Sequence, residues 1–214
     1  MSSPIGHALA GIALAWGADL VPGIRSWRTA PSSASWYERA GAGLTLTCAV
    51  LAAAPDLDLF FGRFHRTMTH SLISVAVVAV VAGAAGLVAG RVRPPRLARG
   101  ARGARGAMTR IVIMCAGAWA THLLLDWLTA DRSTPRGIQL LWPFDGRWFI
   151  SGWDIFPGSE RRQLFSAATM RRNVAAIAQD VAILAPIVVA LWLVRVKTLA
   201  GLASQLTRGH HPSQ

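Results

Sequence analysis

Long apolar runs, interrupted by short polar stretches, fill most of the chain. The clearest run, residues 71–90, has 20 consecutive residues without a charged side chain. At ~1.5 Å of rise per residue, a helix of this length reaches about 30 Å, which is the thickness of the hydrocarbon core of a bilayer. Interrupted apolar segments of similar length lie at about 4–22, 41–60, 110–130 and 174–195. The pattern predicts an all-α fold, a polytopic membrane helical bundle of about five transmembrane helices.

A polar, tryptophan-rich stretch from Asp131 to Arg172 separates the fourth and fifth predicted spans. It is too long for a simple turn, so we expect a polar loop region before the last helix. Pro186 lies inside the fifth span and should kink it. These boundaries predict a single membrane-embedded domain over residues 1–197 and a polar C-terminal tail over residues 198–214.

The composition agrees with a membrane protein. Hydrophobic residues make up 53% of the 214 residues and charged residues only 15%, with a mean hydropathy of +0.40. Soluble domains carry roughly 25% charged residues, so these values argue against an ordinary cytosolic enzyme and exclude intrinsic disorder. Cys48 and Cys115 lie in apolar runs, without metal-binding or disulfide spacing, and we interpret them as small core residues. No Lys or Arg precedes Arg25, so the N-terminus lacks the pattern of a cleavable signal peptide.

The net charge of +12 comes almost entirely from arginine. With five crossings, the loops after the first, third and fifth spans lie on one membrane face and hold 13 Lys and Arg residues, whereas the opposite face holds 9. Because cytoplasmic loops carry an excess of Lys and Arg, the first of these is the predicted cytoplasmic face. The low-complexity segment Ala98–Ala107 lacks the aromatic residues that stack on bases. We interpret it as part of a cytoplasmic loop and expect no nucleic-acid partner.

Histidines and aspartates, which are costly in a membrane unless paired or ligated, gather at the ends of the predicted spans. His7 begins the first span, Asp56 and Asp58 end the second, His65 and His70 precede the third, and His122 and Asp126 lie toward the end of the fourth. These four ends share one membrane face, whichever face is cytoplasmic. The alternation of crossings therefore predicts that the seven side chains meet at one membrane surface.

The local spacings suit metal ligation. His122 and Asp126 are four residues apart, so a helix presents them on one face. Asp56 and Asp58 follow Pro55, which ends the helix and leaves both carboxylates in a turn. Imidazole combined with carboxylate favours Zn, Mn or Fe over Ca or Mg. Seven candidates exceed the needs of one tetrahedral ion. Either two metals bind, or one metal is backed by carboxylates that hold the histidine tautomers.

Each of these residues has an ordinary interpretation when it is taken alone. His122 could be a buried histidine with satisfied hydrogen bonds, Asp56 a turn residue, and His7 an interfacial side chain. Together, these interpretations would require seven ligand-type residues to collect at one end of a bundle by accident. The convergence therefore favours a shared metal site.

Other polar residues have less specific interpretations. We expect Asp19 to be an interfacial partner of Arg25. Asp180 could pair with Arg66 or with an arginine of the 171–172 pair, or approach the metal from outside its ligands. Asp154 is a further candidate ligand. Arg66, adjacent to His65, is well placed to hold an anionic substrate, and the hydroxyl groups of Thr69 and Ser71 could hydrogen-bond carboxylates or substrate oxygens.

The ordered combination of these motifs resembles a known family. The shared pattern consists of Gly6-His7, Pro55-Asp56-Leu57-Asp58, His65-Arg66, Thr69-His70-Ser71, His122 with Asp126, and Leu140-Leu141-Trp142-Pro143. It covers about residues 5–150 and resembles the bacterial membrane-bound, metal-dependent hydrolases of the YdjM-like family. The resemblance implies an integral inner-membrane protein that hydrolyses its substrate through a bound metal.

Three features depart from the family pattern. Thr67 replaces the small Gly expected after His-Arg, Leu59 follows the second Asp where family members often have His, and residues 131–134 look inserted before Pro135. These departures leave the ligand set intact and concern the substrate contacts.

Residues and resemblance together predict a membrane-bound, metal-dependent hydrolase with its site at the membrane–water interface, on the outer face of the inner membrane. The predicted metal ligands are His7, Asp56, Asp58, His65, His70, His122 and Asp126. Zinc is the first choice of cofactor, as one ion or two, and Mn and Fe are alternatives. Arg66 would neutralise developing negative charge, and His65 is the second candidate for a catalytic role.

The position of the site suggests a phosphoester or lipid-linked substrate, and the lipid bilayer is the expected partner. The alternative is a non-catalytic integral membrane protein with a structural or transported metal ion. Transport requires ionisable groups along a path between the two faces, and here they collect at one end.

Overall fold

The computed structural model describes residues 1–20, 42–92, 101–160, 163 and 165–208. Within these residues the chain forms helices and loops, with two isolated β-bridges and no strand. The elements in chain order are α1 (Pro4–Ala18), α3 (Ala42–Ala53), the 3₁₀-helix η1 (Ala54–Phe64), α4 (Leu72–Val92), α5 (Ala101–Leu128) and α6 (Ala167–Arg208). The predicted all-α class is confirmed.

Three helices are long and apolar enough to cross a membrane. The spanning segments are Leu72–Ala89 of α4, Met108–Leu128 of α5 and Ala167–Val196 of α6. They correspond to the third, fourth and fifth predicted spans. At the positions of the first two predicted spans, α1 has 15 residues and α3 has 12. The described residues thus contain three helices of spanning length and two shorter ones.

The helix boundaries have local causes. Ser3 caps α1 by accepting a hydrogen bond from the backbone N–H of Gly6 at 3.0 Å, and Pro4 occupies the first turn, where its missing N–H costs nothing. α3 ends at Ala53, because the residue before Pro55 is disfavoured in the α conformation. The chain continues as η1, which carries both Asp56 and Asp58.

Two helices extend beyond their predicted limits. α5 begins at Ala101, so most of the Arg-Gly-Ala tract that we expected in a loop is helical, in keeping with the high helix propensity of Ala and Arg. α6 begins at Ala167, passes through Pro186 and ends at Arg208, so part of the predicted polar tail belongs to this helix.

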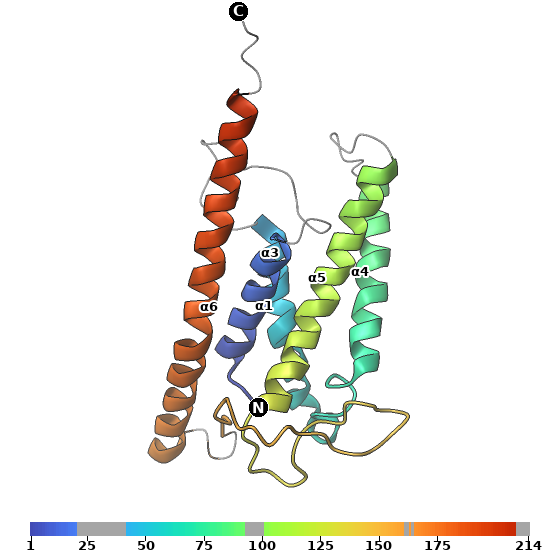
Figure 1. The fold of residues 1–214 in the computed structure, drawn as a ribbon. Coiled ribbons are helices and arrows are strands. Elements are labelled where there is room, and N and C mark those ends of the chain that lie inside the picture. Colours follow the sequence, from blue (N-terminus) through green and yellow to red (C-terminus); the bar gives the residue numbers. More distant parts are fainter. Residues whose placement is uncertain (21–41, 93–100, 161–162, 164, 209–214) are drawn as a thin grey trace, which may run out of the picture.

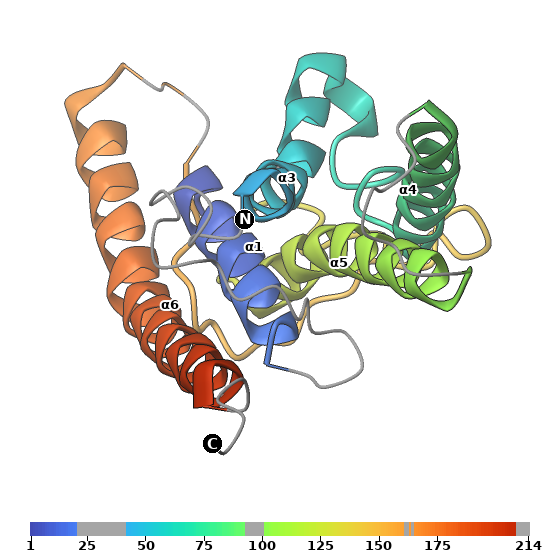
Figure 2. The ribbon, with the colours of Figure 1, turned by 90° about the horizontal axis from the view of Figure 1, so that it is seen from above.

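α1 lies at the centre of the bundle. It contacts α3, α5 and α6, while α4 packs against α5 (Figures 1 and 2). The α1–α3 contact is close, since a Cβ placed on Gly11 would lie 2.4 Å from the carbonyl oxygen of Cys48. Small residues allow such approaches between membrane helices. The core among α1, α3 and α5 consists of Ala15, Cys48, Ala52, Met114 and Ala118. Cys48 and Cys115 are both buried, as predicted.

The outer surface of α4 suits a lipid environment. Only 6% of Leu72–Ala89 is buried inside the protein, and Val77, Val80, Val81 and Leu87 are each more than half exposed. A continuous apolar surface of this kind is rare on soluble monomers and marks a membrane or partner contact. The sequence, which is uncharged over this whole segment, assigns it to lipid.

The polar loop between α5 and α6 folds over one end of the bundle, where α1 and α4 begin and α5 ends (Figure 1). It is fastened by backbone hydrogen bonds from Ala130 N to the Phe156 carbonyl (2.8 Å), from Ser151 N to the Trp127 carbonyl (2.9 Å) and from Leu72 N to the Leu140 carbonyl (2.9 Å). Ile138 and Phe156 of this loop are buried. This loop between α5 and α6 therefore packs over this end of the bundle, and we call it the covering loop.

Charged residues join the helices at the opposite end of α1. The carboxylate of Asp19 pairs with Arg110 of α5 and accepts a hydrogen bond from Nε of Arg195 of α6 at 3.0 Å. Arg25, the partner that we expected for Asp19, lies outside the described residues.

Candidate metal centre

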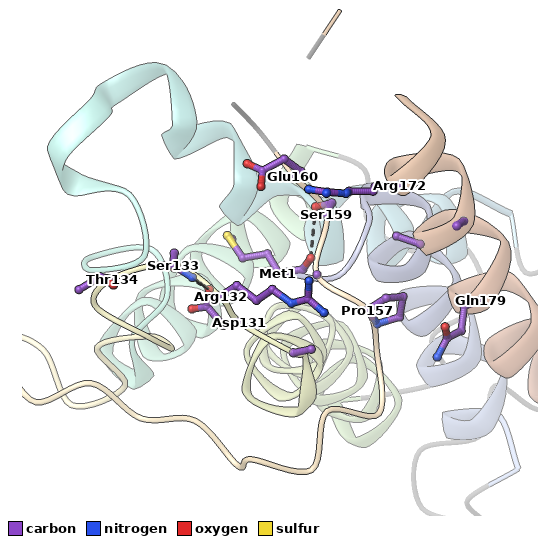
Figure 3. A pocket seen from close by; sticks show the side chains of 14 residues that line it. Met1, Asp131, Arg132, Ser133, Thr134, Pro157, Ser159, Glu160, Arg172 and Gln179 are labelled. Atoms are coloured by element: carbon purple, nitrogen blue, oxygen red, sulfur yellow. Dashed lines mark hydrogen bonds between the residues drawn. The ribbon is translucent and has the colours of Figure 1, made fainter. Parts of the chain in front are cut away.

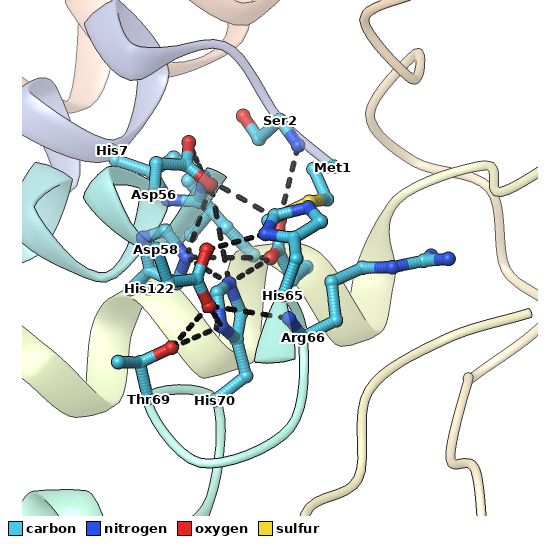
Figure 4. A network of polar contacts seen from close by, with 12 residues as sticks. Met1, Ser2, His7, Asp56, Asp58, His65, Arg66, Thr69, His70 and His122 are labelled. Atoms are coloured by element: carbon cyan, nitrogen blue, oxygen red, sulfur yellow. Dashed lines mark hydrogen bonds and ion pairs between the residues drawn. The ribbon is translucent and has the colours of Figure 1, made fainter. Parts of the chain in front are cut away.

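The seven predicted ligand residues lie together, six of them labelled in Figure 4, and Asp126 contacts three of the histidines. The seven come from the N-terminus of α1, from η1, from the loop that precedes α4 and from the last turns of α5. Six of them are buried and the seventh, His65, is half-buried. The residues are His7, Asp56, Asp58, His65, His70, His122 and Asp126.

Four of these residues form a tight donor set. One ligand atom from each of Asp56, His70, His122 and Asp126 lies within 4.8 Å of the others. The Nε2 atoms of His70 and His122 are 2.9 Å apart, and Oδ2 of Asp126 lies 3.3 Å from both. Oδ1 of Asp56 lies 3.9 and 3.8 Å from the same two nitrogens. Four ligands at about 2.0–2.1 Å from one ion in a tetrahedron would lie about 3.3 Å apart, so these spacings suit one ion.

Hydrogen bonds at the far side of each ring turn the two Nε2 atoms inward. Nδ1 of His122 donates to the carbonyl oxygen of Ala52 at 2.8 Å, and Nδ1 of His70 lies 3.2 Å from Oδ2 of Asp58. A neutral histidine that donates from Nδ1 carries a lone pair on Nε2. Two such lone pairs facing each other at 2.9 Å repel, so a positive charge is needed between them.

His70 has an electrostatic environment that favours positive charge. Burial lowers the pKa of His70, but the nearby carboxylates of Asp126 and Asp58 outweigh this effect and raise the pKa to about 9. A proton or a metal cation can supply the charge at Nε2. The surrounding carboxylates favour a divalent cation, because Oδ2 of Asp126 is buried without a hydrogen-bond partner beside both Nε2 atoms. The donor set therefore fits a divalent metal ion.

Asp58 acts on the histidines from outside the donor set. It accepts hydrogen bonds from Thr69 Oγ1 and from the backbone N–H of Arg66 (3.2 Å), and it contacts Nδ1 of both His65 and His70. Burial would raise the pKa of Asp58, but the hydrogen bonds from His65 and His70 hold it well below its usual range. Asp58 is thus an ionised carboxylate that orients His70, an arrangement common behind metal-ligating histidines.

His7 completes the cluster from α1. Its ring stacks on that of His122, with the ring centroids 3.7 Å apart, and its Nε2 lies 3.4 Å from Oδ1 of Asp126 and 3.9 Å from Oδ2 of Asp56. Oδ1 of Asp126 also accepts a hydrogen bond from the backbone N–H of Ser2 at 3.2 Å. His7 is fully buried, and neither of its ring nitrogens makes a hydrogen bond.

Asp180 contacts Ser2 and Ser3, and Ser2 in turn bonds Asp126 of the donor set. Oδ2 of Asp180 accepts hydrogen bonds from Ser2 Oγ (2.8 Å), Ser3 N (2.8 Å) and Ser3 Oγ (2.6 Å), so it fastens the start of α1 to α6 instead of pairing with an arginine. The sequence signal for this role is the Ser-Ser-Pro run before a helix, but only the packing of α6 supplies the partner. Asp154 is exposed and lies outside the donor set.

The comparisons agree with the motifs. The sequence profile of the family described as YdjM inner membrane protein matches residues 1–201. The chain belongs to this family. No curated protein and no solved structure matches it. The family description and the three spanning helices identify a multi-pass protein of the inner membrane.

In this YdjM-family chain, Arg66 joins the loop before α4, which carries His65 and His70, to the covering loop. Its guanidinium pairs with Asp131, donates to Ser133 Oγ at 2.7 Å and to the Pro135 carbonyl at 3.0 Å, and lies over the ring of Trp148. Its charge is thus matched by a carboxylate of the covering loop. The residues around 131–134, which look inserted in the sequence, supply this contact.

A cavity of about 600 Å³ opens beside the N-terminus (Figure 3). It lies between the covering loop and α6, and its lining includes Met1, Asp131, Arg132, Glu160 and Arg172. Met1 forms part of its wall, and the next residue, Ser2, donates to Asp126 of the donor set. The cavity wall at Met1 is therefore joined through the adjacent residue Ser2 to Asp126 of the candidate metal centre. The sequence motifs gave no sign of this cavity, because its walls come from three distant segments.

Proposed function

We propose that this YdjM-family protein is a membrane-bound, metal-dependent hydrolase. The observation that carries the proposal is the buried set of two imidazole nitrogens and two carboxylates, with both Nε2 atoms turned toward each other by hydrogen bonds at Nδ1. Asp56, His70, His122 and Asp126 would hold a divalent ion. Zinc is the first choice, because nitrogen and oxygen donors in a set of four are typical of zinc sites.

A divalent ion held there supplies Lewis acidity toward a phosphoryl or carbonyl oxygen and lowers the pKa of water. The chain itself provides the groups that move protons. Nδ1 of His65 is bonded to Asp58, so a neutral His65 accepts protons at Nε2. Its side chain is 17% exposed, whereas those of His7, His70 and His122 are fully buried. His65 can therefore exchange protons with solvent, which a general acid–base group requires.

The cavity beside Met1 suggests the class of substrate. Arg132 and Arg172 line it together with Asp131 and Glu160. Arginine guanidinium groups bind phosphate oxygens in bidentate geometry, and the cavity lies at the end of the spanning helices. We propose a phosphoester substrate, lipid-linked or at the membrane surface. Arg66 would act by holding the covering loop and by adding positive charge near the centre.

The full topology is part of the same proposal. α1 and α3 lie beside the longer helices at the covered end of the bundle and stop short of their far ends (Figure 1). With the residues that flank them, they would complete five passes and leave the centre at one membrane surface. The cation count would place that surface on the outer side of the inner membrane.

The test combines metal analysis with hydrolysis by detergent-purified full-length protein. We expect bound metal in the wild type and turnover of at least one of three chromogenic substrate classes: phosphodiester, phosphomonoester or carboxylic ester. His65→Ala should retain the metal and lose roughly 10²–10⁴-fold in rate. His122→Ala should lose both metal and turnover. Asp145→Asn, in a half-buried aspartate of the covering loop that pairs with Arg147, is the matched control and should resemble the wild type.

A structural metal ion is the competing function, because complete burial of four protein donors is also typical of structural zinc sites. Metal present in stoichiometric amount without turnover of any substrate class would favour it. Wild-type protein that purifies and refolds without metal uptake would contradict both functions.

A further inference from the structure

We infer that the centre binds two divalent cations, the second one at His7, with the carboxylates of Asp56 and Asp126 shared between the two positions. The inference rests on the proposed metal-dependent function and deepens it. It is carried by the environment of His7, which the four-residue donor set leaves unexplained.

His7 is an imidazole buried in the protein without a hydrogen bond. It is 0% exposed, and neither Nδ1 nor Nε2 has a hydrogen-bond partner. Burying such a group without a partner is costly. The ring is also held in place, because it stacks on His122 and its helix is fastened by Ser3 and Asp180. The chain thus positions an imidazole that faces carboxylate oxygens of Asp126 and Asp56 at 3.4 and 3.9 Å without a hydrogen bond, and a cation between them would satisfy these groups.

The two carboxylates each present one oxygen to His7 and the other to the histidine pair. Oδ1 of Asp126 lies 3.4 Å from Nε2 of His7, and Oδ2 of the same residue lies 3.3 Å from Nε2 of His70 and of His122. Oδ2 of Asp56 lies 3.9 Å from Nε2 of His7, while its Oδ1 lies 3.8 Å from Nε2 of His122. Carboxylates that divide their oxygens in this way are suited to bridging two cations.

The second position differs chemically from the first. It offers one imidazole and two carboxylate oxygens from His7, Asp56 and Asp126, and Oδ1 of Asp126 is additionally bonded by the Ser2 N–H at 3.2 Å. Three protein ligands leave a coordination position open, which distinguishes catalytic from structural sites. Hydrolases with paired cations use such sites to hold both oxygens of an in-line displacement. The position at His7 would use Oδ1 of Asp126, which is bonded by Ser2, the neighbour of the cavity-lining Met1, so it would be the one that faces substrate.

The experiment counts ions and detects their coupling in detergent-purified full-length protein. Metal-stripped protein is loaded with Zn²⁺ for elemental analysis and, separately, with Mn²⁺ for electron paramagnetic resonance. We expect two ions per wild-type chain and the spectrum of an exchange-coupled Mn²⁺ pair. His7→Gln should hold one ion per chain and give the spectrum of an isolated Mn²⁺. The control is the double variant His210→Ala, His211→Ala, which removes the two remaining histidines of the sequence and should still bind two ions per chain.

The outcomes separate this inference from the proposed function. One ion per wild-type chain with an uncoupled spectrum would overturn the second position and leave the metal-dependent function standing. A coupled pair retained in His7→Gln would also overturn it, because the pair would then lie elsewhere. No uptake by the wild type would refute both. If His7→Gln fails to fold, the wild-type stoichiometry and spectrum still decide.

Discussion

At the scale of single residues, Asp58 is placed to orient a candidate metal ligand from outside the donor set. It contacts Nδ1 of His70 at 3.2 Å and so fixes which nitrogen faces the donor set. Such orienting partners typically contribute 10–100-fold to metal affinity. Asp58, two positions after Asp56, therefore has a separate role from it.

We predict that Asp58→Asn weakens zinc binding by roughly 10–100-fold while the protein remains folded. An amide can replace only part of the hydrogen bonding of Asp58 and carries no charge to balance His65 and His70. Competition against a chromophoric chelator measures the affinity. Asp145→Asn is the control, since Asp145 bonds with Arg147 at the surface of the covering loop. Equal zinc affinity in Asp58→Asn and the wild type would show that the orienting contact is unimportant.

Gly6 precedes His7 at the point where α1 meets Asp180. A Cβ at this position would lie 2.6 Å from Oδ2 of Asp180 and from Oγ of Ser2, so an added methyl group must displace the anchor of the helix. We expect Gly6→Ala to lower the free energy of unfolding by about 1–3 kcal/mol and to reduce metal uptake.

Gly17→Ala in the same helix is the matched control for this substitution. Its Cβ would have an ordinary contact, 3.9 Å from Leu191, and alanine favours a helix interior. Thermal unfolding followed by tryptophan fluorescence compares the two variants. A drop in Gly17→Ala as large as that in Gly6→Ala would contradict the steric explanation.

At the scale of elements, the sequence predicts the long helices well and the short ones poorly. Residues 71–90 are uncharged and apolar throughout, and α4 occupies Leu72–Val92. The segment 41–60 is also mostly apolar, but Pro55 ends α3 at Ala53 and the chain continues as η1. Apolar composition cannot distinguish a helix that spans the bilayer from one that stops short. A single proline decides the matter here, because it lacks a backbone N–H and disfavours the α conformation in the residue before it.

For the candidate site, the sequence predicts which residues come together but not the separate role of each. Because successive helices alternate in direction, the sequence predicts which ends meet, and the seven side chains do lie together. It does not distinguish the role of Asp56 from that of Asp58, since both follow Pro55 and only the 3₁₀ geometry sends one to the donor set and the other behind His70. Nor does it predict the contact of Asp180 with Ser2 and Ser3, which depends on how α6 packs beside α1.

The contact between Arg66 and Asp131 joins two loops, and it predicts a pH dependence of stability. Burial would raise the pKa of Asp131, but hydrogen bonds from Ser133 and from the Gly137 N–H, together with the charge of Arg66, lower it. A carboxylate with a lowered pKa in the folded state stabilises the protein above its unfolded pKa of about 3.9, and this stabilisation is lost as the pH falls through the folded value.

Asp131→Asn should therefore lower the melting temperature by a constant amount between about pH 5 and pH 8, corresponding to about 1–3 kcal/mol. The difference from the wild type should shrink below about pH 4, where the unfolded carboxylate becomes protonated first and the native one at lower pH. Differential scanning fluorimetry across this range measures both curves. A difference that stays constant into acid, or grows there, would contradict the role assigned to the ionised carboxylate.

At the scale of the whole molecule, a bound ion would connect η1, α5 and the loop before α4, so metal binding and folding should be linked. A ligand present at 1,000 times its dissociation constant stabilises a protein by about 4 kcal/mol. We expect the wild-type melting temperature to rise with zinc concentration and to fall after chelation. His122→Ala should show no zinc-dependent rise, and a rise equal to that of the wild type would place the ion elsewhere.

The cations at the two ends of the bundle predict the orientation of the candidate centre. The 13 Lys and Arg residues on one predicted face and the 9 on the other favour a cytoplasmic position for the first face, and the candidate metal centre would then lie at the second. Cys48 and Cys115 are buried, so newly introduced cysteines can be labelled with low background. Phe144, which is 88% exposed in the covering loop, marks the end with the metal centre, and Ser213 marks the C-terminal tail.

A membrane-impermeant maleimide should label Phe144→Cys in intact spheroplasts and Ser213→Cys only after lysis. The unmodified chain is the control for background from Cys48 and Cys115. The reverse pattern would place the centre on the cytoplasmic side and show that the small excess of cations does not govern this topology. The result also restricts the substrate, because a centre on the outer side can act only on phosphoesters that lie in the outer leaflet or beyond it.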